Sequence, residues 1–138
     1  GLAAALTQRV RRFQERSGIH CRVRVTELGS PLPPELATDL YYICQEALTN
    51  VARHAHATEV DICFESTRAG ILLEIADNGN GIVAAHCTAI ESLGLLGMRE
   101  RAAHHGGTVS WESGDPPGTR VTVQIPAAKS DSTPGASA

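Results

Sequence analysis

Strict alternation of apolar and polar residues is the feature that most constrains the fold of this chain. Four segments alternate with a period of two, and each therefore presents one apolar face. Their apolar residues are Cys21, Val23 and Val25, then Val60, Ile62 and Phe64, then Ile71, Leu73 and Ile75, and lastly Val121, Val123 and Ile125. Val109 and Trp111 indicate one more short strand. A sheet covered on both faces would show continuous apolar strands instead, so we expect a sheet with one covered face.

Three other segments carry apolar residues at helical spacing, namely residues 2–16, 35–54 and 94–105. Residues 83–93 lack a convincing period and are expected to form a loop. The sequence therefore predicts an α/β fold of the α+β kind, a two-layer sandwich. In it, about three helices pack on one side of a mixed, mostly antiparallel sheet of about five strands.

Length and charge limit the class of protein. The chain has 138 residues, which is the size of one domain, and its formal net charge is -3. That charge argues against a general nucleic-acid binder. No apolar run approaches the roughly 18 residues of a membrane span. The four cysteines form no Cys-x-x-Cys pair and indicate buried or half-buried thiols in a reducing compartment.

Arginine is concentrated near the start of the chain. Two interpretations remain open: a solvated helix face continued by the outer face of a strand, or a docking surface for another domain. The residues are Arg9, Arg11, Arg12, Arg16, Arg22 and Arg24.

A first candidate site is Asp77-Asn78-Gly79-Asn80-Gly81, which directly follows the apolar run 71–76. A carboxylate at the end of a strand can hold one hydrogen-bond acceptor against a flat ligand, and glycines let the backbone come close to it. The same residues are also typical of a turn.

Glu46 and Asn50 form a second candidate, because residues four apart project from the same side of a helix, and Arg53 follows one turn later. An acid and an amide could ligate Mg²⁺; the alternative is a polar helix edge. His54 and His56 have no evident third ligand, so we do not predict a zinc site.

Two glycine-containing segments complete the set. Residues 94–99 are predicted to open a helix, whose free N-terminal amides suit phosphate, or to start a purely structural helix. Pro117-Gly118-Thr119 precedes the last strand and on its own indicates a hairpin turn. His104-His105 lies near a helix C-terminus, where it fits the helix dipole.

These motifs occur in the same order as those of the ATP-binding catalytic domain of a bacterial sensor histidine kinase, which this chain resembles. Residues 45–55 (QEALTNVARHA) resemble its N box, residues 77–81 its G1 box and residues 94–101 its G2 box, while Gly106-Gly107 and Gly118-Thr119 match the closing pattern. The sequences of the N box and G2 box are similar to those of the nitrate/nitrite-sensor (HisKA_3-type) subfamily of two-component kinases. The resemblance covers roughly residues 19–126 and implies the Bergerat (GHKL, HATPase_c) fold shared with gyrase, Hsp90 and MutL.

The resemblance also implies roles for the matching residues at the adenine end of an ATP site. Asp77 would accept a hydrogen bond from the adenine amino group, and Thr119 would support it. Gly79 and Gly81 would shape the adenine pocket.

At the phosphate end, Asn50 would ligate Mg²⁺, and Glu46 would polarise the attacking group or help to arrange the metal; these are the two expected catalytic residues. Residues 83–93 would form the ATP lid. The expected phosphate contacts are Gly94, Leu95, Gly97 and Met98 with the amides around them, and Arg53 and His54.

The function implied by the resemblance is binding of ATP and Mg²⁺ and supply of the γ-phosphoryl group to a histidine on a separate dimerisation domain of the same parent, with a response regulator as an indirect partner. Alternatives are a GHKL-type ATPase, in which Glu46 activates water, and a nucleotide-dependent interaction module.

The expected organisation has three parts. Residues 1–18 contain no histidine and are expected to be the end of a dimerisation helix or a linker, residues 19–126 the catalytic domain, and residues 127–138 a disordered tail. The isolated domain is expected to be monomeric and cytoplasmic, with no nucleic-acid partner. An inner-membrane anchor in the parent is left open.

Overall fold

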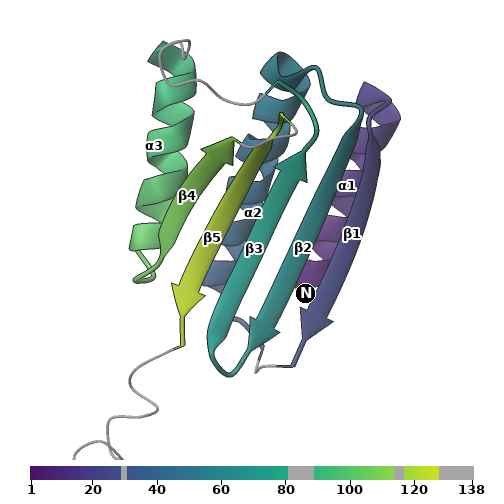
Figure 1. The fold of residues 1–138 in the computed structure, drawn as a ribbon. Coiled ribbons are helices and arrows are strands. Elements are labelled where there is room, and N and C mark those ends of the chain that lie inside the picture. The colour runs from purple at the N-terminus through teal and green to yellow at the C-terminus, as the bar shows by residue number, and fades with distance from the viewer. Residues whose placement is uncertain (29–30, 81–88, 114–116, 128–138) are drawn as a thin grey trace, which may run out of the picture.

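The chain folds into two layers, a five-stranded sheet and a layer of helices on one of its faces (Figure 1). The computed structural model describes residues 1–28, 31–80, 89–113 and 117–127, and within these ranges all side chains except those of residues 54–55 and 89–93. The predicted α/β sandwich is confirmed.

The sheet is mixed, as predicted. Its strands are β1 (His20–Glu27), β2 (Glu59–Thr67), β3 (Gly70–Asp77), β4 (Thr108–Ser113) and β5 (Thr119–Pro126). Their order is β1-β2-β3-β5-β4, in which β1 and β2 are parallel and the three other neighbouring pairs are antiparallel. The central strand β3 therefore lies between β2 and β5, and it ends at Asp77.

The helices are α1 (Leu2–Ser17), α2 (Pro34–Asn50) and α3 (Ala89–Ala103). Two of the predicted boundaries differ from the structure by four residues or more, and the others agree to within two. The predicted helix 35–54 changes after Asn50 into a five-residue π-helix, η1 (Val51–Ala55). The predicted helix start at Gly94 is wrong, because α3 begins at Ala89. A glycine inside a helix costs only about 1 kcal/mol relative to alanine, so Gly94 and Gly97 do not prevent the helix from extending upstream.

The inward residues of β2, β3, β4, β5 and the helices form one hydrophobic cluster, against which the half-buried Cys21 and Val23 of β1 pack. From α1 it includes Leu2, Leu6, Val10 and Phe13. Helix α1 therefore shares the core of the sandwich; that it is the end of a dimerisation helix stays a prediction. In the described part of the chain, no helix combines the length and apolarity that crossing a membrane would require.

The outer face of the sheet is polar. On this face Arg22 pairs with Asp61 across β1 and β2, with 2.7 Å between Nε and Oδ1. This contact agrees with the solvated interpretation for that one arginine, and the docking interpretation stays a prediction. Of the cysteines, Cys21 and Cys63 are half-buried and Cys44 is buried, and all three are free thiols. Burial raises the pKa of Cys44 to about 12.

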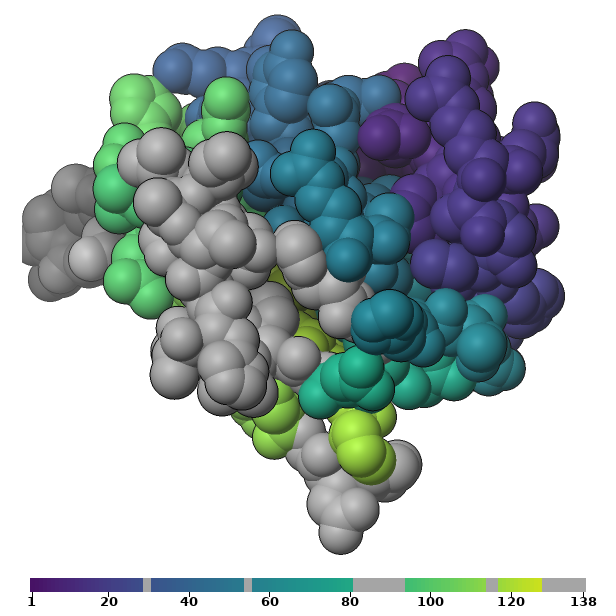
Figure 2. All heavy atoms as spheres, turned by 90° about the horizontal axis from the view of Figure 1, so that it is seen from above, coloured from purple at the N-terminus to yellow at the C-terminus, as the bar shows by residue number. Residues whose placement is uncertain are grey.

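Figure 1 shows which parts of the fold meet at one end of the sandwich. The C-terminal ends of β3 and α2 lie at the same end as the start of β5 and the N-terminal part of α3. Figure 2 looks onto this end, where parts of α2 and η1 (blue), β3 (teal) and β5 (yellow-green) reach the surface. Asn50 ends α2, Asp77 ends β3 and Thr119 starts β5, so three of the sequence motifs each bring a candidate residue to this end.

Substituting Leu6 tests whether α1 belongs to the folding unit. Leu6→Ala removes a fully buried side chain from the core. We expect the free energy of unfolding to fall by about 2–5 kcal/mol, measured by urea denaturation. Arg11→Ala on the exposed side of the same helix is the control, with little expected change. A loss of stability for Leu6→Ala no larger than for the control would contradict a shared core.

Candidate functional site

Asp77 is a half-buried carboxylate at the end of the central strand. Its Oδ1 accepts a hydrogen bond of 2.8 Å from the backbone N–H of Gly79. Burial raises the pKa of Asp77 above its usual value, although hydrogen bonds from the backbone N–H groups of Gly79 and Thr119 oppose the rise. The backbone thus fixes the direction of this carboxylate, which can accept a further hydrogen bond from a ligand.

The start of β5 is pressed against the end of β3. A Cβ placed on Gly118 would lie 2.2 Å from the backbone oxygen of Asp77, and Gly118 has a φ of +156°, so only glycine fits there. The hairpin interpretation of this segment is also confirmed, because β4 and β5 pair antiparallel with Ser113 opposite Thr119. Gly118 therefore lies in the connection between β4 and β5 and, at the same time, against the end of β3.

Thr119 adds a second polar group beside Asp77. Its side chain is buried, and within the described residues its Oγ1 has no hydrogen-bond partner. A buried hydroxyl without a partner is costly, so such a group is a candidate contact for a ligand. The structure brings Asp77, Gly79 and Thr119 together, as the sequence predicted; Gly81 lies outside the described residues.

Asn78 links two strands, whereas the turn expected from this motif is the bond from the Gly79 N–H back to Oδ1 of Asp77. Its Oδ1 accepts hydrogen bonds from the backbone N–H groups of Thr58 (2.9 Å) and Glu59 (3.0 Å), and its Nδ2 donates to the Thr58 hydroxyl (2.9 Å). Asn78 therefore fastens the end of β3 to the start of β2. Sequence reasoning did not assign this role, although asparagine side chains commonly bond to nearby backbone in turns.

Glu46 meets α3 at Gly94. A Cβ on Gly94 would lie 3.2 Å from both Cδ and Oε1 of Glu46, so the absence of a side chain on α3 makes room for this carboxylate. Glu46 and Asn50 are half-buried on α2. Two motifs that are far apart in the sequence therefore meet in the fold.

Asn50 is the last residue of α2, immediately before η1. Single π-helical turns are frequent at functional sites. Arg53 lies in η1 and is exposed, whereas the side chain of His54 is outside the described set. The positions of Arg53 and His54 relative to a phosphate stay predictions.

The longer α3 changes the interpretation of the residues predicted to contact phosphate. Only the first four N–H groups of a helix lack partners within it, and Gly94 lies beyond these in a helix that starts at Ala89. In this structure Gly94 and Gly97 therefore offer no helix N-terminus. Met98 is buried in the core and Leu95 packs against it, so these side chains face inward. Nucleotide contacts by the four residues stay predictions.

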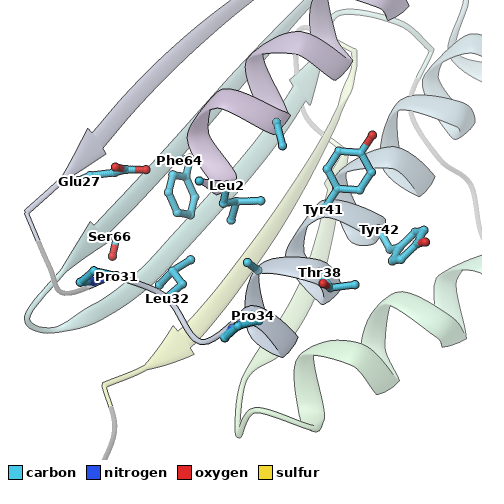
Figure 3. A pocket seen from close by; sticks show the side chains of 13 residues that line it. Leu2, Glu27, Pro31, Leu32, Pro34, Thr38, Tyr41, Tyr42, Phe64 and Ser66 are labelled. Carbon is cyan, nitrogen blue, oxygen red and sulfur yellow. The ribbon is translucent and has the colours of Figure 1, made fainter.

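A cavity lies away from the site residues described so far. It has a volume of about 640 Å³ and is formed where the starts of α1 and α2 meet the ends of β1 and β2 (Figure 3). Its walls include Leu2, Leu32, Tyr41 and Phe64. None of the sequence motifs contributes to it.

The residues beside Asp77 fit a nucleotide base, since they supply a directed acceptor, an unpartnered buried hydroxyl and a close backbone. The described residues contain no group of three or more histidines, cysteines, aspartates or glutamates that could hold a metal by itself. A Mg²⁺ ion on Asn50 would therefore draw most of its ligands from phosphate and water, as Mg²⁺ commonly does.

Comparison with known proteins gives consistent relatives. Residues 35–129 match the family described as histidine kinase-, DNA gyrase B-, and HSP90-like ATPase. The oxygen sensor histidine kinase NreB of Staphylococcus carnosus is 32% identical over 126 residues, which are 91% of this chain and 36% of NreB. The sensor histidine kinase YxjM of Bacillus subtilis is 30% identical over 123 residues, covering 88% of this chain and 29% of YxjM. The chain thus spans about a third of the length of these relatives.

Solved structures agree on the fold. The ATP binding domain of PrrB from Mycobacterium tuberculosis is 27% identical with a TM-score of 0.61, covering 92% of this chain and 91% of that one. The histidine kinase domain of the blue-light activated kinase EL346 from Erythrobacter litoralis has a TM-score of 0.75 at 23% identity, over 93% of this chain and 62% of that one.

Two glycine substitutions should have opposite effects on stability. Gly118→Ala places a Cβ against Asp77, and we expect a loss of about 1–3 kcal/mol in the free energy of unfolding. Gly97→Ala meets nothing within 4 Å, and we expect a gain of about 0.5–1 kcal/mol because alanine favours helix. Chemical denaturation of both variants measures the difference. Equal stabilities would contradict the close approach of β5 to β3.

Proposed function

Because this chain belongs to the histidine kinase-, DNA gyrase B-, and HSP90-like ATPase family, we propose that it binds ATP with Mg²⁺ and supplies the γ-phosphoryl group to a histidine of a sensor kinase. The acceptor histidine would lie on a dimerisation domain of the same parent protein. Phosphate would pass from there to a response regulator. The isolated domain would be a cytoplasmic monomer.

One observation carries the proposal. The end of β3, the start of β5 and the last turns of α2 lie at one end of the sandwich (Figure 1). These elements carry the directed carboxylate of Asp77, the unpartnered hydroxyl of Thr119 and the contact of Glu46 with Gly94. The acceptor group suits the adenine end of ATP, and the acid and amide of α2 suit the phosphate end. The names of the relatives, which are sensor histidine kinases, support the choice of a protein histidine as acceptor.

The proposed chemistry is a phosphoryl transfer. A nitrogen of the acceptor imidazole forms a bond to the γ-phosphorus, while the bond from that phosphorus to the oxygen bridging to the β-phosphate breaks. The attacking nitrogen is the one that carries the lone pair, so the hydrogen is on the other ring nitrogen. That proton passes to solvent, and Glu46 is the proposed group that polarises this N–H. Asp77 holds the base and so fixes the phosphates relative to Glu46; positioning of this kind supplies most of the catalysis in phosphoryl transfer. Asn50 would hold Mg²⁺, which would neutralise charge on the phosphates.

Transfer of labelled phosphate tests the proposal. The unmodified chain is mixed with Mg²⁺, ATP labelled at the γ-phosphate and a separately produced dimerisation domain that contains its histidine. We expect label on the acceptor domain, and none when its histidine is replaced by glutamine. ATP hydrolysis at the same rate with and without acceptor, and no labelled acceptor, would favour the ATPase alternative and contradict the kinase proposal.

The variant Asp77→Asn should weaken ATP binding without destabilising the fold. The raised pKa of Asp77 means that the folded state disfavours its ionised form, so this group stabilises the fold less as the pH rises through its folded pKa. We therefore expect Asp77→Asn to unfold at the same or a higher temperature at pH 7. Its ATP affinity, measured by calorimetry, should fall by about 100-fold or more, because the amide can turn a donor toward the adenine amino group. Undiminished affinity would refute the adenine role.

A further inference from the structure

Helices α2 and α3 run in opposite directions and meet along a ladder of contacts whose two ends differ in chemistry. At the lower end, Oδ1 of Asp39 accepts a hydrogen bond from Nη1 of Arg101, and its Oδ2 lies 2.7 Å from the ring Nε2 of His105. The first distance is also 2.7 Å. The side chains of Asp39 and His105 are each only 15% exposed. This end of the ladder is a directional ionic contact in which Asp39 and His105 are largely buried and the Arg101 side chain is 43% exposed.

Arg101 is further held by an aromatic ring. Its guanidinium carbon lies 4.7 Å from the ring centroid of Tyr42, one helical turn above Asp39 on α2. Although burial raises the pKa of Asp39, the hydrogen bonds and charges of His105 and Arg101 lower it below its usual value. Asp39 is therefore ionised at neutral pH, and since a carboxylate then only accepts, His105 Nε2 carries the hydrogen.

At the upper end of this ladder, two of the described α3 residues that face α2 are glycines, Gly94 and Gly97. Gly94 lies against the Glu46 carboxylate, and a Cβ on Gly97 would meet nothing within 4 Å. Gly94, Gly97, Glu46 and Arg101 share the lining of a cavity of about 210 Å³ between the two helices. Among the described side chains, the hydrogen bonds between α2 and the C-terminal end of α3 are made by Asp39 and Glu35, and none lies beside Glu46.

The spacing of residues connects the two ends. Seven residues separate Asp39 from Glu46 on α2 (46 − 39 = 7), and seven separate Gly94 from Arg101 on α3 (101 − 94 = 7). With a rise of about 1.5 Å per residue, each interval spans roughly 10 Å. Because the helices are antiparallel, fixing Arg101 on Asp39 brings Gly94 level with Glu46. The other contacts of α3 include buried Met98 and Ala102, and apolar packing is non-directional.

We propose that Asp39 is a positioning residue for phosphoryl transfer: through Arg101 and His105 it fixes the register of α3 on α2, and thereby orients the Glu46 carboxylate. The inference rests on the proposed function, in which Glu46 polarises the attacking group. Asp39 acts from roughly 10 Å along the helix, so it influences the transfer step through Glu46 and leaves nucleotide binding intact.

Asp39→Asn is the first test, because it keeps the shape of the side chain and removes its charge. We expect the transfer rate to the supplied dimerisation domain, at saturating ATP and acceptor, to fall by about 10- to 100-fold, while the Kd for ATP and the KM for the acceptor stay unchanged. Arg101→Gln removes the other partner and should give the same loss. The matched control is Glu35→Gln, which breaks the exposed contact of Glu35 with His104 at the same helix interface and should leave transfer unchanged.

A double-mutant cycle excludes a merely structural role. If Asp39 acts through Glu46, the double variant Asp39→Asn/Glu46→Gln should transfer phosphate at the same residual rate as the single variant Glu46→Gln. An equal fold loss in both backgrounds would overturn the inference, as would transfer at the unmodified rate by both Asp39→Asn and Arg101→Gln. Transfer by the unmodified chain in the same assay keeps this failure distinct from failure of the proposed function; its absence would overturn both.

Discussion

The structure depends on a carboxylate that is kept partly out of water at the end of its central strand. Burial raises the pKa of Asp77, and the neighbouring backbone compensates with N–H groups of Gly79 and Thr119. That compensation requires β5 to start against β3, which only a glycine at position 118 permits. On the other side, Asn78 ties the same corner to the start of β2. Three strands are thus arranged around one acceptor group.

Helix α2 serves two purposes with two faces. Its apolar face, which includes Leu40 and Leu48, belongs to the core and fixes the helix on the sheet. Its polar face carries Asp39, Tyr42 and Glu46 toward α3. A polar group in such a position is maintained at some cost in stability, and this is common where a protein binds a ligand. The same helix can therefore anchor the fold and present the acid and amide of the proposed phosphate end.

Much of this architecture could be predicted from alternation and helical spacing alone. The inward residues of β2 to β5 are those of the predicted apolar faces, such as Ile62 and Leu73, whereas Val25 on the predicted apolar face of β1 is 38% exposed. The direction of β1 relative to β2 could not be obtained from alternation, which is the same for parallel and antiparallel strands. The start of α3 was missed because Gly94 was interpreted as a helix opening, whereas two glycines inside a helix cost too little to end it.

The site was predictable to the extent that its residues form local motifs. Asp77 and Gly79 are two residues apart, a spacing at which an aspartate side chain commonly accepts a hydrogen bond from the backbone. The unpartnered hydroxyl of Thr119 and the need for glycine at position 118 arise from the approach of distant strands. Likewise, His105 was interpreted through the helix dipole, but its partner Asp39 lies 66 residues away in the sequence. Long-range pairs of this kind leave no periodic signal in one sequence.

The central claim is that Asp77 accepts a hydrogen bond from the amino group of adenine, and comparison of two nucleotides tests it most directly. Inosine triphosphate differs from ATP in carrying an oxygen, an acceptor, where adenine carries its amino donor. Calorimetric titration of the unmodified chain with each nucleotide, in the presence of Mg²⁺, measures the difference in affinity. The account predicts that ATP binds about 100-fold or more tightly than inosine triphosphate, because two acceptors would face each other in a partly buried site. Equal affinity for the two nucleotides would contradict it.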